Sequence, residues 1–202
     1  MDATTPDVMP LISFALGLGL AAAAGLRVFV PLLALGLASR HGYVELSAGF
    51  QWLASSPALI AFGTATVVEV VAYHVPFLDH LLDVIATPSA IVAGALASAA
   101  VLTDFPPVVK WTIAILAGGG AAGMVQSATV LARVGSTTFT GGLGNVLLAS
   151  FELFGAIGTV VLAIALPLVA LVLVLAMVVA AAALVRRFAQ RASGSGSAAG
   201  AG

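Results

Sequence analysis

The chain has 202 residues, of which 61% are hydrophobic and 7% carry a charge, and its mean hydropathy is +1.20. Because a soluble domain carries about 25% charged residues, this composition excludes an ordinary water-soluble fold and predicts an integral membrane protein. The net charge of −1 offers no basic surface for nucleic acid, and the lack of cysteine excludes disulfides, thiolate catalysis and cysteine-based zinc sites.

The first apolar segment, 10–39, follows a short polar start at residues 1–9 that holds two acids and no Lys or Arg. That start lacks the positive region of a signal peptide, so we expect the segment to be retained. A bilayer core of about 30 Å needs roughly 20 apolar residues per helix, and this segment is longer. Gly25 and Pro31 within it predict a tilted, kinked or broken helix that a neighbour approaches closely.

Three more spans are predicted, at 57–75, 85–102 and 108–134. The connections between them are polar and carry aromatic residues that suit a membrane interface. Glycines interrupt the fourth span and predict a helix break or close packing at three positions: Gly119, Gly120 and Gly123.

The last apolar segment, 139–184, holds one charged residue, Glu152. At 1.5 Å per residue, a single helix of this length would be about 70 Å long, which is too long for one crossing. We therefore expect two crossings that turn near Leu166 and Pro167, with Glu152 roughly halfway down the first of them. The alternative is a short half-helix or re-entrant piece followed by one long span.

These segments predict an all-α integral membrane protein with about six transmembrane helices in a single domain, 10–187, followed by a flexible Gly/Ser/Ala tail at 188–202. Six crossings, which we favour, put both ends of the domain on the same side of the membrane. Five crossings would put them on opposite sides. The arginines near the C-terminus favour a cytoplasmic C-terminus in either case.

Two stretches of the sequence resemble each other, with Gly25 matching Gly123, and a span with a lone glutamate follows each of them. This pattern predicts two candidate halves, 10–103 and 108–187, related as an inverted repeat of three plus three helices. Inverted repeats with glycine-interrupted helices are typical of transporters whose site lies at mid-depth. A shared Ala/Gly-rich composition is the alternative explanation of the resemblance.

Three ionisable residues lie where the bilayer centre is predicted: Arg27, Glu69 and Glu152. A charge at this depth costs about 2.5–3.5 kcal/mol on insertion scales, and Arg27 is too far from either surface for its side chain to reach water. We therefore predict that Arg27 forms an ion pair with Glu69, Glu152 or both. A purely structural ion pair that fixes how the helices dock is the alternative role.

One arginine and two glutamates leave one carboxylate in excess, which needs a proton or a cation to balance its charge. This count predicts a proton-coupled or cation-conducting site. Gln126 and Asn145 are candidates to line the path of the ion or solute, or to hold helices together by hydrogen bonds.

Neither a metal nor a cofactor is expected. Four residues near the end of the second span were considered as metal ligands: His74, Asp79, His80 and Asp83. They lack a metal-binding pattern such as HExxH and lie where polar residues suit the membrane boundary. The glycine-rich residues 141–145 are not followed by Gly-Lys-Ser/Thr and form no phosphate loop. Since no catalytic constellation lies within a span, we expect no enzymatic activity.

The stretches "AAGLRVFVPLLALGL", "VVEVVAYHVPFLDHLLDVI" and "GGAAGMVQSATVLARVGSTTFTGGLGN", with a glutamate in the last segment, resemble a bacterial membrane-protein family. That family is catalogued as a domain of unknown function, number four-one-two-six. The resemblance covers roughly residues 10–187 and implies a multi-pass protein of the bacterial inner membrane. It implies no activity, substrate or catalytic residues.

The leading functional hypothesis is a small transporter or channel for an ion or small solute. A thin bundle of about 200 residues would bury its Ala/Gly faces by forming a homo-oligomer. The second hypothesis is a membrane-embedded substrate-binding subunit of a larger uptake complex, similar to the six-span components of vitamin importers. The third is a structural membrane protein with no transport activity. The expected partners are the lipid bilayer, a small solute or ion and further copies of the chain.

Overall fold

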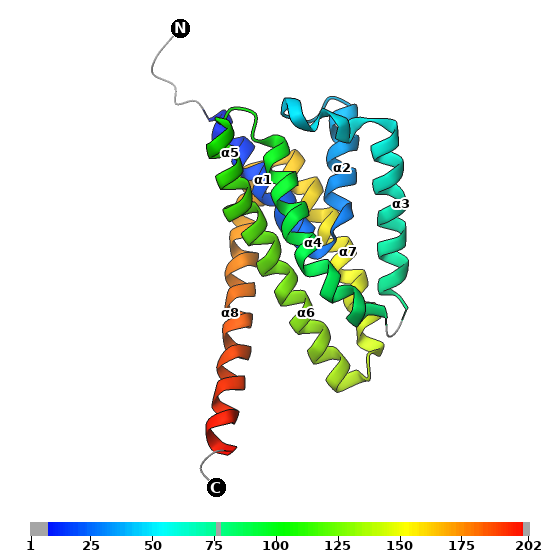
Figure 1. Ribbon diagram of the computed structural model, residues 1–202, viewed down its shortest axis with the longest axis vertical. Coiled ribbons are helices and arrows are strands. Elements are labelled where there is room, and N and C mark those ends of the chain that lie inside the picture. Colours follow the sequence, from blue (N-terminus) through cyan, green and yellow to red (C-terminus); the bar gives the residue numbers. More distant parts are fainter. Residues whose placement is uncertain (1–7, 76–77, 200–202) are drawn as a thin grey trace.

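The computed structural model describes residues 8–75 and 78–199, apart from the side chains of 78–82 and 191–199. Throughout this part of the chain the regular structure is helical, and the helices form one bundle (Figure 1). In chain order the elements are α1 (Met9–Leu26), α2 (Phe29–Arg40), η1 (Ala48–Ala54), α3 (Ser56–Tyr73), α4 (Leu78–Val101), α5 (Pro107–Ile113), η2 (Ala114–Gly119), α6 (Gly120–Thr140), α7 (Leu143–Ala165) and α8 (Pro167–Ala199).

Six helical segments of the described chain are long and apolar enough to cross a membrane. They confirm the all-α membrane fold that the composition predicts. The turn expected near Leu166 is also confirmed, because α7 ends at Ala165 and α8 begins at Pro167. The six segments are Met9–Leu26, Ser56–Tyr73, Asp83–Val101, Pro107–Thr140, Leu143–Ala165 and Pro167–Gln190.

The first apolar segment does not run through the bundle as one helix. Instead, α1 and α2 form a hairpin that opens toward one end of the bundle and has its tip at Arg27 (Figure 1). Ser13, near the start of α1, donates to Asp104 in the α4–α5 loop. The backbone N–H of Ser47, which follows α2, donates to Ala100 at the end of α4. Since α2 has 12 residues, the tip at Arg27 lies about 18 Å inside the bundle, measured along α2 from the end at which the hairpin opens.

Pro31 explains why the chain breaks at Arg27. A proline within a helix cannot donate to the carbonyl four residues earlier, and its ring clashes with that carbonyl. For Pro31 this carbonyl belongs to Arg27, whose backbone is extended, with φ −147° and ψ 120°. The break leaves Pro31 in the first turn of α2, where the missing N–H costs little. The interruption predicted for this segment is therefore a reversal of the chain.

The hairpin changes the topology. Because α1 and α2 turn back, α3, α4, the α5–α6 segment, α7 and α8 are the elements that connect the two ends of the bundle, and the described chain starts and finishes at opposite ends (Figure 1). The expectation that both ends lie on the same side is therefore wrong. The inverted repeat does not fit this arrangement either. Residues 10–103 start and finish at the same end of the bundle, whereas residues 108–187 start at that end and finish at the opposite one. Residues 188–199, expected as a flexible tail, continue α8 as helix.

Small residues bring α1, α4 and α6 into close contact. A Cβ added at Gly25 would lie 2.4 Å from the carbonyl oxygen of Ala122 on α6. One added at Gly94 would lie 2.5 Å from the Cβ of Ala122, and one added at Gly17 would lie 2.9 Å from Oγ of Ser98. Such close approach is how helices associate in lipid, where the hydrophobic effect does not drive them together. The two stretches that resemble each other in sequence thus pack against each other.

The π-helical turn η2 interrupts the long α5–α6 segment and ends at Gly119, the first of the three predicted glycines. A Cβ added at Gly118 would lie 2.7 Å from the Cβ of Ser98 on α4. Those added at Gly119 and Gly123 would lie 3.3 and 3.0 Å from a side chain of α4. One added at Gly120 would meet nothing within 4 Å, so of the two alternatives predicted there, a helix break or close packing, Gly120 does not show close packing. Gly118 takes that role, because it is the glycine that faces α4 most closely.

Candidate functional site

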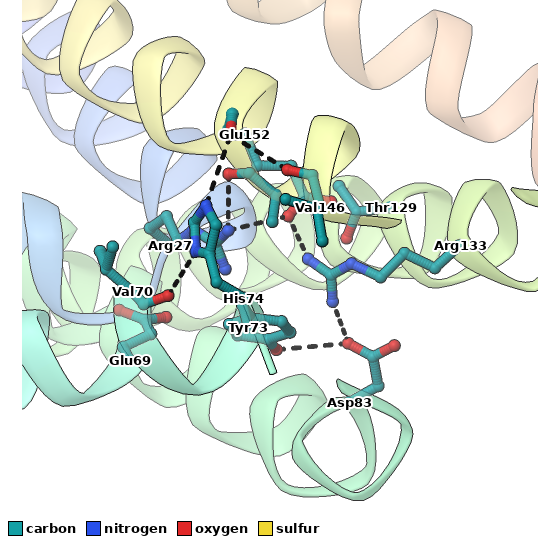
Figure 2. A network of polar contacts seen from close by, with 12 residues as sticks. Arg27, Glu69, Val70, Tyr73, His74, Asp83, Thr129, Arg133, Val146 and Glu152 are labelled. Atoms are coloured by element: carbon teal, nitrogen blue, oxygen red, sulfur yellow. Dashed lines mark hydrogen bonds and ion pairs between the residues drawn. The ribbon is translucent and has the colours of Figure 1, made fainter. Parts of the chain in front are cut away.

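Ionisable side chains from five parts of the chain meet at the tip of the hairpin (Figure 2). They come from the break after α1 and from α3, α4, α6 and α7, and each is at most 9% exposed. We call this set of residues the tip network: Arg27, Glu69, Tyr73, Asp83, Arg133 and Glu152.

Arg27 binds the hairpin tip to α7. Its Nη2 lies 3.4 Å from Oε2 of Glu152 and donates to the carbonyl oxygen of Ala149, at 2.7 Å. The ion pair predicted for Arg27 is therefore confirmed, with Glu152 as the partner. Because Arg27 is only 1% exposed, water screens this attraction little.

Arg133 joins three helices through one guanidinium group. Its Nη1 donates to Oδ1 of Asp83 on α4, and its Nη2 donates to Oε2 of Glu152 on α7. Glu152 thus serves both arginines through the same oxygen atom. Loss of this one carboxylate would leave two buried guanidinium groups without their shared partner.

The ring of Tyr73 attaches α3 to both arginines. Its centroid lies 4.3 Å from Cζ of Arg27 and 4.1 Å from Cζ of Arg133. At these distances the ring attracts a cation through its electron-rich face. The hydroxyl of Tyr73 donates to Asp83, at 3.2 Å. Tyr73 therefore contacts three charged groups of the network at once.

Glu69 binds the backbone of the hairpin tip. Its Oε1 accepts the N–H of Val28 at 2.8 Å, and its Oε2 accepts the N–H of Phe29 at 3.2 Å. N–H groups at the start of a helix have no partner within that helix, and a negative charge there also faces the positive end of the helix dipole. Glu69 of α3 therefore caps α2 and holds the tip in place.

The charges of the network do not balance. If all its acids and arginines are ionised, Arg27 and Arg133 carry two positive charges, and Glu69, Asp83 and Glu152 carry three negative charges. The prediction from one arginine and two glutamates had the same excess of one carboxylate. A buried excess charge is costly unless a proton or a further positive group balances it.

Several buried donors at the network have no acceptor within the described part of the chain. They are Nε and Nη1 of Arg27, Nε of Arg133 and Nε2 of Gln126. Gln126 precedes Arg133 by two helical turns and therefore lies on the same face of α6. Because an unpaired buried donor costs free energy, these atoms could accommodate a further hydrogen-bond acceptor.

Two cavities reach the network from different sides. A cavity of about 540 Å³ between α2, α3 and α4 is lined by Glu69 and Tyr73, and we call it the α3–α4 cavity. A cavity of about 450 Å³ between α6, α7 and α8 is lined by Glu152 and by Leu26, next to the break. One carboxylate of the network is therefore accessible from each cavity.

The family model described as Domain of unknown function (DUF4126) matches residues 14–187, a range that contains the whole tip network. The chain belongs to this family. The resemblance found in the sequence is thereby confirmed. No curated protein and no solved structure matches the chain. Since the description of the family names no activity, the function of this member has to be argued from the network itself.

Gln126 and Asn145, the polar residues proposed to line a path, are both buried in this member of the family. Nδ2 of Asn145 donates to Oγ1 of Thr137 at 3.0 Å and thereby joins the start of α7 to the end of α6. Asn145 therefore supports the turn beside the tip network, whereas Gln126 lies two helical turns before Arg133 on α6. A role for either residue in a path stays a prediction.

Sequence reasoning missed Arg133, Asp83 and Tyr73. Arg133 stands near the end of the predicted fourth span, where a charge at the membrane boundary is usual. In the structure α6 continues to Thr140, so Arg133 lies two turns inside the helix. Asp83 precedes the predicted third span and was placed among the lipid headgroups. A search that assigned every charged residue near a predicted span a partner of opposite charge could have linked Asp83 to Arg133.

The residues considered as metal ligands have other partners where the structure describes them. Asp83 binds Arg133, and Nδ1 of His74 donates to the carbonyl oxygen of Val70 at 2.7 Å. The side chains of Asp79 and His80 lie outside the described part. Among the described residues, no group of three or more His, Asp or Glu residues is placed to hold a metal ion.

Proposed function

We propose that the protein is a small membrane transporter or channel whose ion or small solute passes the tip network. The observation that carries this proposal is the burial of two arginines and three carboxylates at a break in an apolar helix. Ionisable residues at membrane depth are rare and mark ion pathways, substrate sites and proton relays. Many transporters also build their sites from half-helices that end inside the membrane, and α2 likewise begins at the buried tip of the hairpin.

Glu69 is the residue to which we assign proton or cation binding. It lines the α3–α4 cavity, whereas Glu152 is held by two arginines. Protonation turns one oxygen of Glu69 into a hydroxyl group and removes the negative charge. The neutral carboxyl then holds the N–H groups of Val28 and Phe29 more weakly, because charge-assisted hydrogen bonds are roughly twice as strong as neutral ones. Proton binding would thus loosen the hairpin tip, and proton release would tighten it.

Proton entry into proteoliposomes tests this proposal. Liposomes loaded with a pH-sensitive dye are given a K⁺ gradient and valinomycin, so that the membrane potential drives protons inward. We expect faster acidification with the protein than without it. Glu69→Gln, which has nearly the same volume and no charge, should abolish the increase, and the exposed Glu45→Gln should keep it. The measurement is made both with and without a Na⁺ gradient. If liposomes with the protein acidify no faster than protein-free liposomes under either condition, the proposal is contradicted.

A structural network that only fixes how the helices dock is the second candidate. The observation that favours it is the pairing of both arginines with carboxylates. Buried ion pairs of this kind can specify one arrangement of helices without any transport. This candidate predicts that Glu69→Gln and Glu152→Gln lower stability while neither changes any flux.

We also infer a homo-oligomer in the bacterial inner membrane with a cytoplasmic C-terminus. The arginines that follow the apolar part of α8 lie at the end of the bundle opposite Arg40 and Lys110, and they are Arg186, Arg187 and Arg191. Their excess supports a cytoplasmic C-terminus by the positive-inside rule. Labelling at the two ends from outside intact cells would test the orientation, and the mass of the detergent-solubilised protein would test the oligomer.

A further inference from the structure

The α3–α4 cavity adjoins another cavity, of about 500 Å³, that lies toward η1. The two cavities share three lining residues: Val28, Phe29 and Ser89. We call the joined space the α3–α4 groove. Its shallow end is lined by Trp52 of η1, and its deep end is lined by Glu69 and Tyr73 of the tip network.

The rim of the groove is apolar and faces outward. Four of its lining residues are more than half exposed: Trp52, Val68, Ile85 and Val92. In a membrane such a rim lies against acyl chains, so the groove opens sideways into the lipid. The volume of each cavity falls in the range of about 300–1,000 Å³ that is usual for small-molecule sites. The groove therefore suits an apolar molecule that arrives through the bilayer.

The charge of the groove is confined to its deep end. Among the described residues that line it, Glu69 is the one with a formal charge. The carboxylate accepts one backbone N–H at each oxygen, and each oxygen keeps a further lone pair. Since the tip network as a whole has an excess of negative charge, this end of the groove favours a positive group.

From this geometry we infer that the groove binds a lipophilic cation, a molecule with one apolar chain or ring system and an ammonium head. The head donates to Glu69, and the apolar part extends toward Trp52. An anionic head would be repelled by the carboxylate, and a neutral head would lack the charge-assisted hydrogen bond. This inference rests on the proposed function, because it names the class of solute for the same site.

Trp52 allows binding to be measured directly, because bromine atoms quench tryptophan fluorescence on contact. The probe is dodecylamine with bromine near the end of its chain, and brominated dodecanol and dodecanoate are the matched probes with other heads. Trp111→Phe leaves Trp52 as the single tryptophan, since the chain has two. The protein is held in nanodiscs of phosphatidylcholine. This test measures binding alone and does not require any transport.

We expect the amine to reach half-saturation at a concentration at least about tenfold lower than the alcohol or the acid. One buried hydrogen bond to a charged group is enough for such a difference. Glu69→Gln should bring the amine to the level of the alcohol. The amine partitions equally into the bilayer whether the protein carries Glu69 or the Gln substitution. The change in half-saturation therefore measures the contact between the ammonium head and Glu69, not the uptake of the amine by the lipid.

A second pair of variants tests the groove without touching the network. Ser89→Phe places a ring where the two cavities join and should abolish saturable quenching by all three probes. Val67→Phe adds the same ring on the lipid-facing side of α3, outside the groove, and should leave quenching unchanged. Equal quenching curves for these two variants would show contact from the bulk bilayer and would overturn the inference.

The remaining outcomes separate this inference from the proposed function. Equal half-saturation by the three probes overturns the lipophilic cation and indicates a groove for acyl chains such as those of phospholipids. Amine selectivity that depends on Glu69, together with absent proton entry, supports the binding site and overturns the passage of protons through the tip network. Proton entry that depends on Glu69, with no amine selectivity, overturns the class of solute and leaves the transport function in place.

Discussion

The two parts of the α1–α2 hairpin are held in different ways. Along its length, α1 meets α4 and α6 through glycines such as Gly17 and Gly25, where neighbouring atoms leave no room for a Cβ. At its tip, Arg27 and Glu69 connect the chain to other helices by ion pairs and hydrogen bonds. Close packing cannot adjust without losing contacts, whereas polar partners can exchange. The comparison separates a closely packed stem from a tip that is held by polar contacts.

Removal of the shared carboxylate should have the largest effect on the tip. Glu152→Ala leaves Arg27 and Arg133 buried without their common partner. Breaking a buried ion pair in this way costs about 3–5 kcal/mol of unfolding free energy. The measurement is equilibrium unfolding in mixed SDS micelles, followed by circular dichroism. Glu45→Ala, at an exposed glutamate, is the control and should change the unfolding free energy little.

A small loss of stability in Glu152→Ala, similar to that of the control, would contradict the role of Glu152 as the shared partner. The arginines would then find other acceptors or water at the tip. In that case the comparison of a packed stem with a polar tip would still stand, but Glu152 would not be the residue on which the tip depends.

The stem is tested by a pair of glycines on different helices. Gly25→Ala forces a Cβ against the backbone of α6, where it would lie 2.4 Å from an oxygen atom. Overpacking of this kind costs about 1–3 kcal/mol. Gly120→Ala adds the same atom where nothing lies within 4 Å, so stability should stay the same or rise by up to about 1 kcal/mol. Equal losses for the two variants would show that helix flexibility, and not close packing, decides the result.

The difference between the packed stem and the polar tip also explains which features could be predicted from the sequence. Length and composition predicted the apolar helices. The cost of a charge in lipid predicted that Arg27 pairs with an acidic residue, and that residue is Glu152. The reversal of the chain was not predicted, because Pro31 in a long apolar segment fits a kink as well as a hairpin. Arg133 was missed because a charge near the end of a predicted span is usual. Which helices pack together depends on three-dimensional contacts that periodicity does not encode.

Tyr73→Phe should have the smallest effect and tests how the tip is held. The variant keeps the ring that lies over Arg27 and Arg133, and it loses one hydrogen bond to Asp83. Because Asp83 keeps its ion pair with Arg133, we expect a loss of only about 0.5–1.5 kcal/mol of unfolding free energy in mixed micelles. Tyr73→Leu also removes the ring, so its further loss measures the attraction between the ring and the two guanidinium groups. Equal stability of the Phe and Leu variants would mean that the ring acts by packing alone, and the tip would then resemble the stem more closely than we argue.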